Sequence, residues 1–496
     1  MTGAGCPTAG RPGRLVLLVV AVLVGSLTAC GDAPDRTDTA PLIILSGLDQ
    51  SRGGQRGALI EQWNRMHPDR PAKIVELSSI ADAQRSEMLA RAQSGADVDV
   101  YNLDVTWTAE FAEAGYLRPL DPEQISTEGF LAGPLQTCRY DDRLWALPFN
   151  TDVGLLYYNK RLLGADQPPR EWATLLAQAA RVQRDSGGTV AGYIGQYGDY
   201  EGLTVTALEL IWGARGDVID SAGRVLPDPV AFQVGLDRLK QISPPSVPPY
   251  DEAGGILEFR EGKALFLRNW PVADAELRGN PEAPPPDFGV APLPERSAAL
   301  GGQNLAIAAT SKDPDSARDL VEFLTSERSE TLLYTRGGLP ATRAIVYDDP
   351  LLGAAEPAPL SATLREALDD ARSRPALPHY AQVSETLRAI ADGYLRRGEL
   401  AGEDVLRTQL EAAEQGRLLP GCPARPGPRP GGMRSRYAAW RCSRRACSSA
   451  IWPPTNPSAK GGGGGRFRRR RGWRAPHLAG RRPRATRGRW TPRWWP

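Results

Sequence analysis

The sequence predicts an α/β protein of two lobes, joined by strands that cross from one lobe to the other. Expected strands and helices alternate along residues 41–115, a rhythm typical of a parallel sheet covered by helices. The apolar run of residues 146–158 is interrupted by Asn150, Thr151 and Asp152. Polar side chains inside an apolar strand suit a segment that leaves one hydrophobic core, passes a cleft and enters a second core.

The first lobe is expected to begin with three strand–helix pairs. Apolar residues at helical spacing from Leu59 to Met66 predict a helix, and His67 followed by proline ends it. The strands are predicted at 41–46, 73–77 and 98–103, and the helices at 55–66, after the capping residue Asp82, and at 105–114.

The remaining elements continue the mixed pattern after Asp152. Asp313 and Pro314 start one clear amphipathic helix, because Asp caps the first turn and Pro fits the first helical position. Loops are predicted at 193–200 and 295–302, strands at 263–269, 288–293 and 305–309, and further helices at 171–185, 203–212, 229–242, 255–262, 360–374, 385–397 and 403–414.

The chain is expected to divide into five parts. These are a signal segment at 1–29, a spacer at 30–40, a first lobe at 41–149 with 303–325, a second lobe at 152–298 with 328–418, and a disordered tail at 420–496. The tail is rich in Arg, Pro and Gly, and such a composition cannot build a packed core. It is interpreted either as a basic surface-binding tail or as a G+C-rich gene read out of frame.

The N-terminus has the features of a targeting segment. Arg11 and Arg14 precede a short apolar run at residues 15–24, and Leu-Thr-Ala-Cys follows at residues 27–30. The run is too short to span a bilayer as a mature helix. The last four residues resemble a bacterial lipobox, in which Cys30 becomes the diacylated, palmitate-bearing first residue; a plain cleaved signal is the alternative. The lipobox predicts an exported protein that is lipid-anchored at the outer face of the cytoplasmic membrane.

The charge distribution argues against a nucleic-acid partner. The formal net charge is +2, yet 20 Arg and one Lys lie from Arg417 onward, where no Asp or Glu occurs. The rest of the chain has 39 basic and 58 acidic residues, a net charge of about −19. An acidic body repels a phosphate backbone.

Cysteine and histidine usage limits redox and metal chemistry. Of the six Cys, only Cys138 and Cys422 lie in or beside the expected folded body. An exported context permits a disulfide between them, and two unpaired thiols are the alternative. No metal site is expected, because the sequence has three His and no Cys-x-x-Cys pair.

Several residues are candidates for ligand binding. Ligands bind beyond the carboxyl ends of parallel strands, where Asp104 and then Trp107 follow the third strand. Asp104 as a helix cap is the alternative. Tyr200 and Glu201 close a Gly- and Tyr-rich loop that offers flat faces beside an acceptor, or else only a solvent-facing loop. Trp270, followed by proline at a strand end, is placed to face a cleft, with a core Trp as the alternative.

Six segments, in order, carry a family resemblance. They are NLDVTWTAEFAEAGYLRPLD, ALPFNTDVGLLYYNKRLL, YEGLTVTALELIWGARG, FREGKALFLRNWP, GGQNLAIAATSKDPDSARDLVEFLTS and GGLPATR. With them, residues 42–418 resemble an extracellular solute-binding protein of a carbohydrate ABC importer, in the maltose- and trehalose-binding group of family 1. The resemblance implies two α/β lobes with three crossings, near 148–153, 297–303 and 324–329.

The resemblance also implies a sugar held between the lobes. Asp104 and Asp152, beside Asn150, would accept hydroxyl hydrogen bonds, Tyr200 and Trp270 would stack on sugar faces, and Glu201 would bond hydroxyls from the second lobe. The weaker candidates are Gly302, Gln303 and Arg343. The loop after the first strand, GLDQSRGGQ, departs from the family by lacking charged ligand residues, unless Asp49 serves.

The predicted function is therefore that of a non-enzymatic receptor. A monomer without a cofactor would bind an oligosaccharide, such as the disaccharides trehalose or maltose, and deliver it to the permease subunits of an ABC importer. An exported glycoside hydrolase is one alternative, since scattered carboxylates could supply an acid and a base. A receptor for a non-sugar solute is the other.

Overall fold

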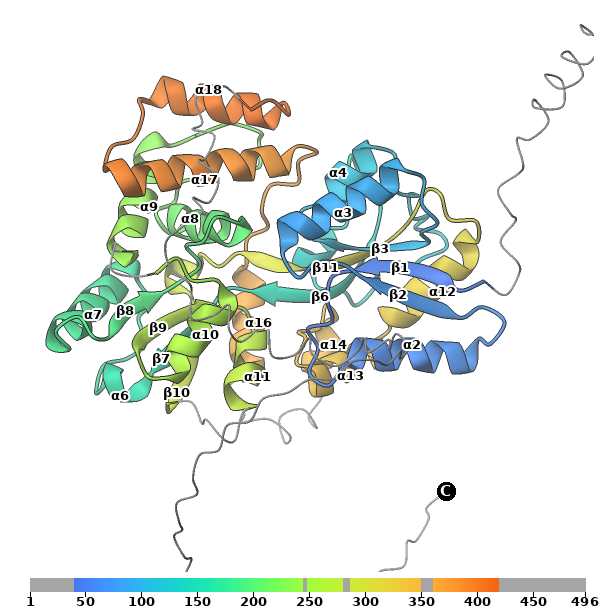
Figure 1. Ribbon diagram of the computed structural model, residues 1–496, viewed down its shortest axis with the longest axis horizontal. Coiled ribbons are helices and arrows are strands. Elements are labelled where there is room, and N and C mark those ends of the chain that lie inside the picture. Colours follow the sequence, from blue (N-terminus) through green and yellow to red (C-terminus); the bar gives the residue numbers. More distant parts are fainter. Residues whose placement is uncertain (1–39, 244–247, 280–285, 349–359, 419–496) are drawn as a thin grey trace, which may run out of the picture. The chain divides into compact units, whose positions relative to one another are not determined.

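The computed structural model describes residues 40–243, 248–279, 286–348 and 360–418, and it has the predicted two-lobe α/β fold (Figure 1). The signal segment, Cys30, Cys422 and the expected tail lie outside the described residues. The first lobe contains β1 (Leu42–Ser46), α2 (Gln55–Met66), β2 (Ala72–Glu76), α3 (Ala81–Gln93), β3 (Val100–Asp104), α4 (Thr108–Glu113), α5 (Ala132–Gln136), β4 (Arg139–Tyr140), β5 (Arg143–Leu144), α12 (Pro314–Leu324) and α13 (Glu327–Gly337).

The second lobe is built on a separate sheet and core. Its elements are β7 (Leu155–Asn159), α6 (Lys160–Leu163), α7 (Trp172–Asp185), β8 (Ala191–Ile194), α8 (Glu201–Gly213), α9 (Pro229–Ile242), α10 (Glu252–Arg260), β9 (Ala264–Asn269), α11 (Val272–Arg278), β10 (Phe288–Pro292), η1 (Pro294–Arg296), α14 (Ala344–Tyr347), α16 (Leu360–Asp370), α17 (Tyr380–Arg397) and α18 (Glu403–Glu414). Strands β6 (Leu147–Val153) and β11 (Leu300–Ile307) serve both lobes.

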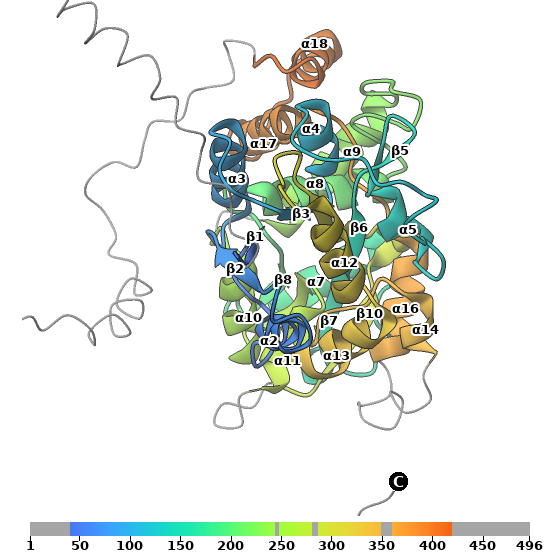
Figure 2. The same ribbon diagram turned by 90° about the vertical axis from the view of Figure 1, so that its right-hand side faces the viewer.

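The sheet of the first lobe has the strand order β2-β1-β3-β11-β6. Strands β1, β2 and β3 are parallel, as the strand–helix alternation predicts, and β11 is antiparallel to both β3 and β6. Helices α3 and α4 lie on one side of this sheet, and α2, α12 and α13 lie on the other (Figures 1 and 2). The parallel strands therefore end together at one edge, where Asp104 is the last residue of β3.

The sheet of the second lobe has the order β10-β7-β9-β8. Strands β10, β7 and β9 are antiparallel, and β8 runs parallel to β9. Helices α17 and α18 pack against each other, and α17 also contacts α8 and α9 (Figure 1). None of the helices in the described ranges has the length and apolar character of a membrane span.

Strands β6 and β11 carry the chain between the lobes. In β6, Leu147 lies in the first core and Val153 in the second; in β11, Leu300 lies in the second core and Leu305 in the first. The two strands pair along the whole crossing, which places the polar residues 150–152 at the junction. The interrupted apolar run thus marks the crossing that the sequence predicted.

The third crossing lies later than the predicted position at 324–329. Helix α13 still packs against α2, and its Leu333 belongs to the first core. The next residue, Tyr334, is in the second core, Leu339 returns to the first, and Ala341 lies in the second. The chain therefore crosses around residues 333–341, because α13 packs against the first lobe and the crossing can only follow this helix.

Other elements differ from the sequence in extent. Tyr193, expected in a loop, is part of β8, where it pairs with Phe266. Strand β11 begins at Leu300, inside the expected loop 295–302 and ahead of the expected strand 305–309, because β6 supplies it with a partner. Asp82 does not cap α3, which starts after Ile80 without a side-chain cap.

Candidate functional site

Three polar residues form a row across adjacent strands at the crossing. In the strand registers, Gln303 of β11 lies opposite Asp104 of β3 on one side and Asn150 of β6 on the other. Residues directly opposite in paired strands share a face of the sheet, and Asp152 shares it too, two residues after Asn150. The structure thus brings together four of the predicted ligand-binding residues.

The same face contains buried acceptors that have no protein partner. Asn102 Nδ2 donates to Gln303 Oε1 over 2.9 Å and to Ser46 Oγ over 2.8 Å. The Oδ1 atoms of Asn102 and Asn150 are buried, and neither has a hydrogen-bond partner in the described part of the chain. Buried polar atoms are nearly always satisfied in native proteins. These two acceptors therefore indicate a place for a hydrogen-bond donor from outside the protein.

Trp270 approaches this face from the second lobe. A Cβ atom placed on Gly301 would lie 3.1 Å from Trp270 Cζ3 and 3.1 Å from Asp152 Cβ. Gly301 pairs with Asp152 in the β6–β11 register, so the indole lies close to both residues. The Arg268 guanidinium lies 3.9 Å from the centroid of the indole, and Trp270 stays partly exposed. The aromatic candidate and the acidic candidate therefore belong to one site.

A single carboxylate orients two aromatic rings. Tyr200 OH donates to Glu252 Oε2 over 2.6 Å, and Trp270 Nε1 lies 3.3 Å from Glu252 Oε1. The sequence interpretation missed Glu252. It stands in the first turn of α10 beside the capping residue Asp251, and that local position carries no functional signal. Burial, followed by the charge of Glu252, raises the pKa of Tyr200 above its usual range, so the phenol remains the donor.

Glu201 is occupied by protein partners. Its Oε1 accepts from Arg374 Nη1 over 2.8 Å and from Tyr380 OH over 2.5 Å, and its Oε2 accepts from Ser384 Oγ over 2.5 Å. These contacts differ from the direct ligand contact expected of Glu201, because its acceptors are taken within the second lobe. Arg374, which the sequence interpretation missed, also places Nη2 3.3 Å from Asp104 Oδ1. Glu201 thus supports an arginine that reaches the first lobe.

Asp104 does not cap α4, where Trp107 holds the capping position without a side-chain hydrogen bond. Its Oδ1 accepts from Thr106 N over 3.0 Å and Thr106 Oγ1 over 2.7 Å, which shapes the turn before α4, and it also faces Arg374. Trp107 is a different case, since it is buried in the core of the first lobe. The structure therefore gives Trp107 a packing role in place of the expected contact with a ligand.

Gly302 contributes backbone rather than a side chain. It has φ of 118°, and a Cβ there would lie 2.3 Å from the carbonyl oxygen of Asn150. Only glycine fits this position, which lies just before the register shift between β11 and β6 at Gln303 and Asn304. Its carbonyl accepts from Val105 N over 3.2 Å, so the described protein already uses this atom.

Arg343 does not join the group. Its Nε donates to the carbonyl of Thr325 over 2.7 Å, its Nη1 donates to the carbonyl of Glu128 over 2.9 Å, and the guanidinium lies 3.9 Å from the centroid of Phe130. No contact joins it to the crossing residues within the part of the chain that the structure describes. Its Nε and Nη1 donors are thus used by the backbone carbonyls of Thr325 and Glu128.

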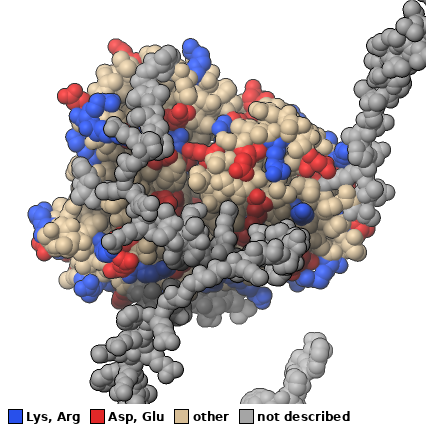
Figure 3. Space-filling model, viewed as in Figure 1, with Lys and Arg blue, Asp and Glu red and all other residues tan. Residues whose placement is uncertain are grey.

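The site is acidic. Burial, followed by the negative charge of Asp104, raises the pKa of Asp152 from 3.8 to about 7, and Arg268 opposes this shift. Figure 3 shows acidic side chains gathered near the middle of the face that Figure 1 presents, where the lobes meet. A ligand that brings hydroxyl or cationic donors therefore suits this acidic site better than an anionic ligand does.

Other candidate sites lie away from the crossing. A cavity of about 670 Å³ is lined by Trp212, Arg238 and Glu295, and none of the predicted site residues borders it. No group of His, Cys, Asp and Glu that could hold a metal occurs among the described residues. Within the described ranges, Cys138 is a free, buried thiol whose Sγ lies 3.7 Å from the carbonyl of Pro134, and its expected partner Cys422 lies outside them.

Comparisons with known proteins agree with this architecture. Residues 51–331 match the family described as bacterial extracellular solute-binding proteins. The chain is 31% identical over 357 residues to a probable ABC transporter-binding protein of Deinococcus radiodurans, covering 66% of this chain and 83% of that one. It is 24% identical over 310 residues to the maltotriose-binding protein of Pyrococcus abyssi, covering 59% of this chain and 64% of that one.

A solved structure shows the same arrangement. The maltose-bound MalE3 of T. maritima is 30% identical, with a TM-score of 0.66, and the match covers 76% of this chain and 98% of that one. The chain therefore belongs to the family of bacterial extracellular solute-binding proteins, which confirms the family resemblance found in the sequence. It is a solute-binding component of an ABC transporter.

Proposed function

We propose that the protein is a lipid-anchored sugar receptor that binds an oligosaccharide, such as maltose or trehalose, between its lobes. The observation that carries this proposal is the convergence of Asp104, Gln303, Asn150 and Asp152 on one sheet face with Trp270 beside them. Sugar hydroxyls pair with carboxylates and amides, and the C–H faces of a sugar ring pack on indole. The bound solute then passes to the permease.

The similar proteins favour a carbohydrate over other solutes. The relative from Pyrococcus abyssi is named for maltotriose, and the MalE3 structure holds maltose. The site offers unpaired acceptors and one partly exposed indole, which are the groups that an uncharged polyol needs. Closure of the lobes would order these groups around the sugar.

Calorimetric titration with maltose, trehalose and maltotriose tests the proposal. We expect saturable one-to-one binding by the wild type, and Trp270→Ala should raise the Kd at least about tenfold, equivalent to about 1.4 kcal/mol. Trp270→Phe keeps an aromatic ring, so its Kd should lie between those of the wild type and of Trp270→Ala. Absence of binding to every saccharide, or binding unaffected by Trp270→Ala, would refute the proposal.

The receptor is proposed to act without cleaving its ligand. A partial match to a thiaminase covers 29% of this chain, whereas the matches that span most of the chain are binding proteins. Prolonged incubation with each bound saccharide should release no new reducing ends. Turnover that disappears in Asp152→Asn would instead favour the hydrolase.

Lipid attachment at Cys30 is proposed from the lipobox-like residues 27–30. In an expressing bacterium, the wild type should partition into detergent, and mass spectrometry of the N-terminus should find a diacylglyceryl cysteine. Cys30→Ser should move the protein to the aqueous phase. An unmodified N-terminus created by cleavage elsewhere would support the plain secretory signal.

A further inference from the structure

The site has more carboxylates than cations. Two arginines reach it, Arg268 beneath the indole and Arg374 at the lobe boundary. The carboxylates that contact these arginines or the aromatic rings, or that share the sheet face, are Asp104, Asp152, Glu201, Glu209 and Glu252. Ionised together, these groups leave a surplus of negative charge where the lobes meet.

Neither arginine is available to neutralise Asp152 directly. Arg374 binds Glu201 and Asp104. Arg268 Nε and Nη2 donate to the two oxygens of Glu209 over 2.9 and 2.6 Å, and both side chains of this pair are 1% exposed. Such a buried bidentate pair satisfies its own charges. The cations of the site are thus committed to other carboxylates.

The Asp152 carboxylate makes no hydrogen bond and no ion pair with any residue in the described ranges, although Asp152 keeps some exposure. On the same sheet face, two residues away, Asn150 Oδ1 is buried without a partner, and Asn150 is 5% exposed. Asn150 Oδ1 can only accept hydrogen bonds, and the same is true of the Asp152 carboxylate when it is ionised. The complementary ligand group is one that only donates and brings positive charge.

We propose that the ligand of this site is a saccharide that carries a protonated amino group, placed against Asp152 and Asn150. This inference rests on the proposed sugar-receptor function and specifies its ligand class. An ammonium offers three donors and compensates the charge of Asp152 beside Asp104. A neutral hydroxyl supplies only the hydrogen bond, and a uronic acid or sugar phosphate adds a further negative charge to the site.

A matched set of ligands separates these cases. Amino-deoxy forms of maltose and trehalose, each with one hydroxyl replaced, are compared by calorimetry with the parent sugars and with the corresponding uronic acids. At neutral pH, we expect at least one amino form to bind at least tenfold tighter than its parent, and the uronic acids to bind more weakly than their parents. High salt should reduce the advantage of the amino form.

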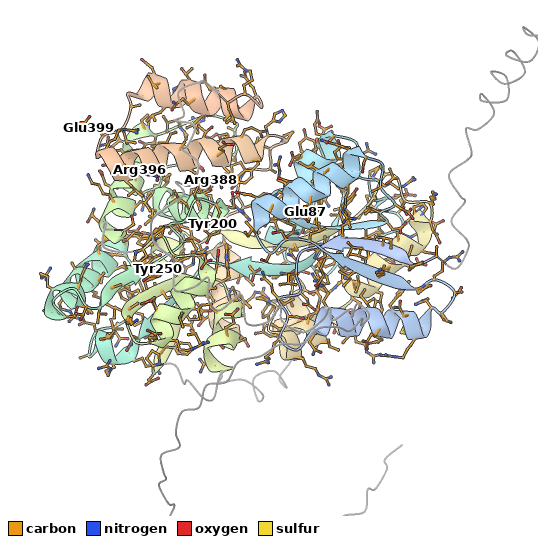
Figure 4. The ribbon with its side chains drawn as sticks, viewed as in Figure 1. Glu87, Tyr200, Tyr250, Arg388, Arg396 and Glu399 are labelled. Carbon is orange, nitrogen blue, oxygen red and sulfur yellow. The ribbon has the colours of Figure 1, made fainter. Side chains whose placement is uncertain are left out.

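The ratio of parent Kd to amino-sugar Kd is then measured in variants. Asp152→Asn should bring this ratio close to one, because the charge is lost while the shape is kept. Glu399→Gln is the matched control; it removes one exposed acid just beyond the C-terminal end of α17, remote from the crossing (Figure 4), and should keep the wild-type ratio. An equal fall of the ratio in both variants would attribute the effect to net charge and overturn the proposal.

The outcomes distinguish this inference from the function on which it rests. If the parent sugars bind and every amino form binds equally or more weakly, the inference fails and the sugar receptor stands. If no saccharide of any charge binds, both fail. Tighter binding of an amino form that survives in Asp152→Asn would also overturn the assignment to this residue.

Discussion

Arg374 Nη2 lies 3.3 Å from Asp104 Oδ1, and this contact joins the second lobe to the first. A second contact of the same kind links Arg388 of α17 to Asp82 of α3 over 2.8 Å. Both arginines lie in the C-terminal part of the described chain, far in sequence from the acids that they meet. The relative position of the lobes is therefore coupled to ion pairs as well as to the crossing strands.

The Arg388–Asp82 pair is expected to favour the arrangement in which the two lobes close on a bound saccharide. Arg388→Gln should weaken saccharide binding by a few fold, since a partly exposed ion pair contributes about 0.2–1 kcal/mol. Arg396→Gln is a matched control on the same helix, because among the described residues Arg396 pairs only with Asp392, also in α17. Figure 4 labels both arginines. Equal Kd values for the two variants would show that the bridge does not influence binding.

Glu252 is expected to act by holding the two rings. Glu252→Ala releases Tyr200 and Trp270 from their shared acceptor, so the Kd for saccharide should rise about fivefold to tenfold, or about 1 kcal/mol or more. Glu258→Gln lies on the same helix and breaks, within the described ranges, only an ion pair with Lys263, so its Kd should match that of the wild type. If Glu252→Ala bound saccharide with the Kd of the wild type, the orientation of the two rings by Glu252 would not contribute to binding.

The stability of the protein should depend on pH through Asp152. Its pKa is raised to about 7 in the folded state from 3.8, so the folded protein binds this proton more tightly than the unfolded chain. Stability from this group is present below about pH 4 and is lost as the pH rises to about 7. Asp152→Asn has no such proton, and its melting temperature relative to the wild type should rise over this interval.

Thermal unfolding of both proteins between about pH 4 and about pH 8 measures that difference. Glu330 contributes equally to both proteins and cancels, although burial also raises its pKa to about 7 against its bonds to Thr342 and Arg343. A difference in melting temperature that stays constant with pH would contradict the assigned shift.

The buried Arg268–Glu209 pair is expected to be important for stability. Glu209→Gln leaves Arg268 without its charged partner in the core, which costs about 3–5 kcal/mol. Lys160→Gln breaks an exposed pair with Asp287, where both side chains are at least 49% exposed, and should cost at most about 1 kcal/mol. Urea unfolding compares the two, and similar losses would contradict this account.

Much of the fold is encoded locally and was predicted for that reason. The helix Gln55–Met66 has the predicted limits, since apolar spacing and His67–Pro68 define it within one segment. The crossing through residues 150–152 was visible because polar residues interrupt an apolar strand. The third crossing was misplaced because the position of α13 depends on its packing against α2, which no local pattern encodes.

The site was predictable only in part. Asp104, Asp152 and Trp270 stand at strand ends or at the polar break, and these positions can be identified in the sequence. Arg374 meets Asp104 across 270 residues of sequence, and Glu252 receives Trp270 Nε1 from 18 residues away. Such roles arise from side chains that meet only after folding. A basic residue after a turn, such as Arg343, looks the same in the sequence whether its donors bind a ligand or backbone carbonyls.

The central claim is that a saccharide binds where the lobes meet, against Asp152 and Trp270. A crystal structure of the protein with the tightest-binding saccharide tests this claim most directly. We predict a sugar ring packed on Trp270, with hydroxyl or ammonium donors directed at Asp152 and Asn150. A saccharide bound instead in the cavity beside Trp212 and Arg238, with the crossing residues untouched, would contradict the account.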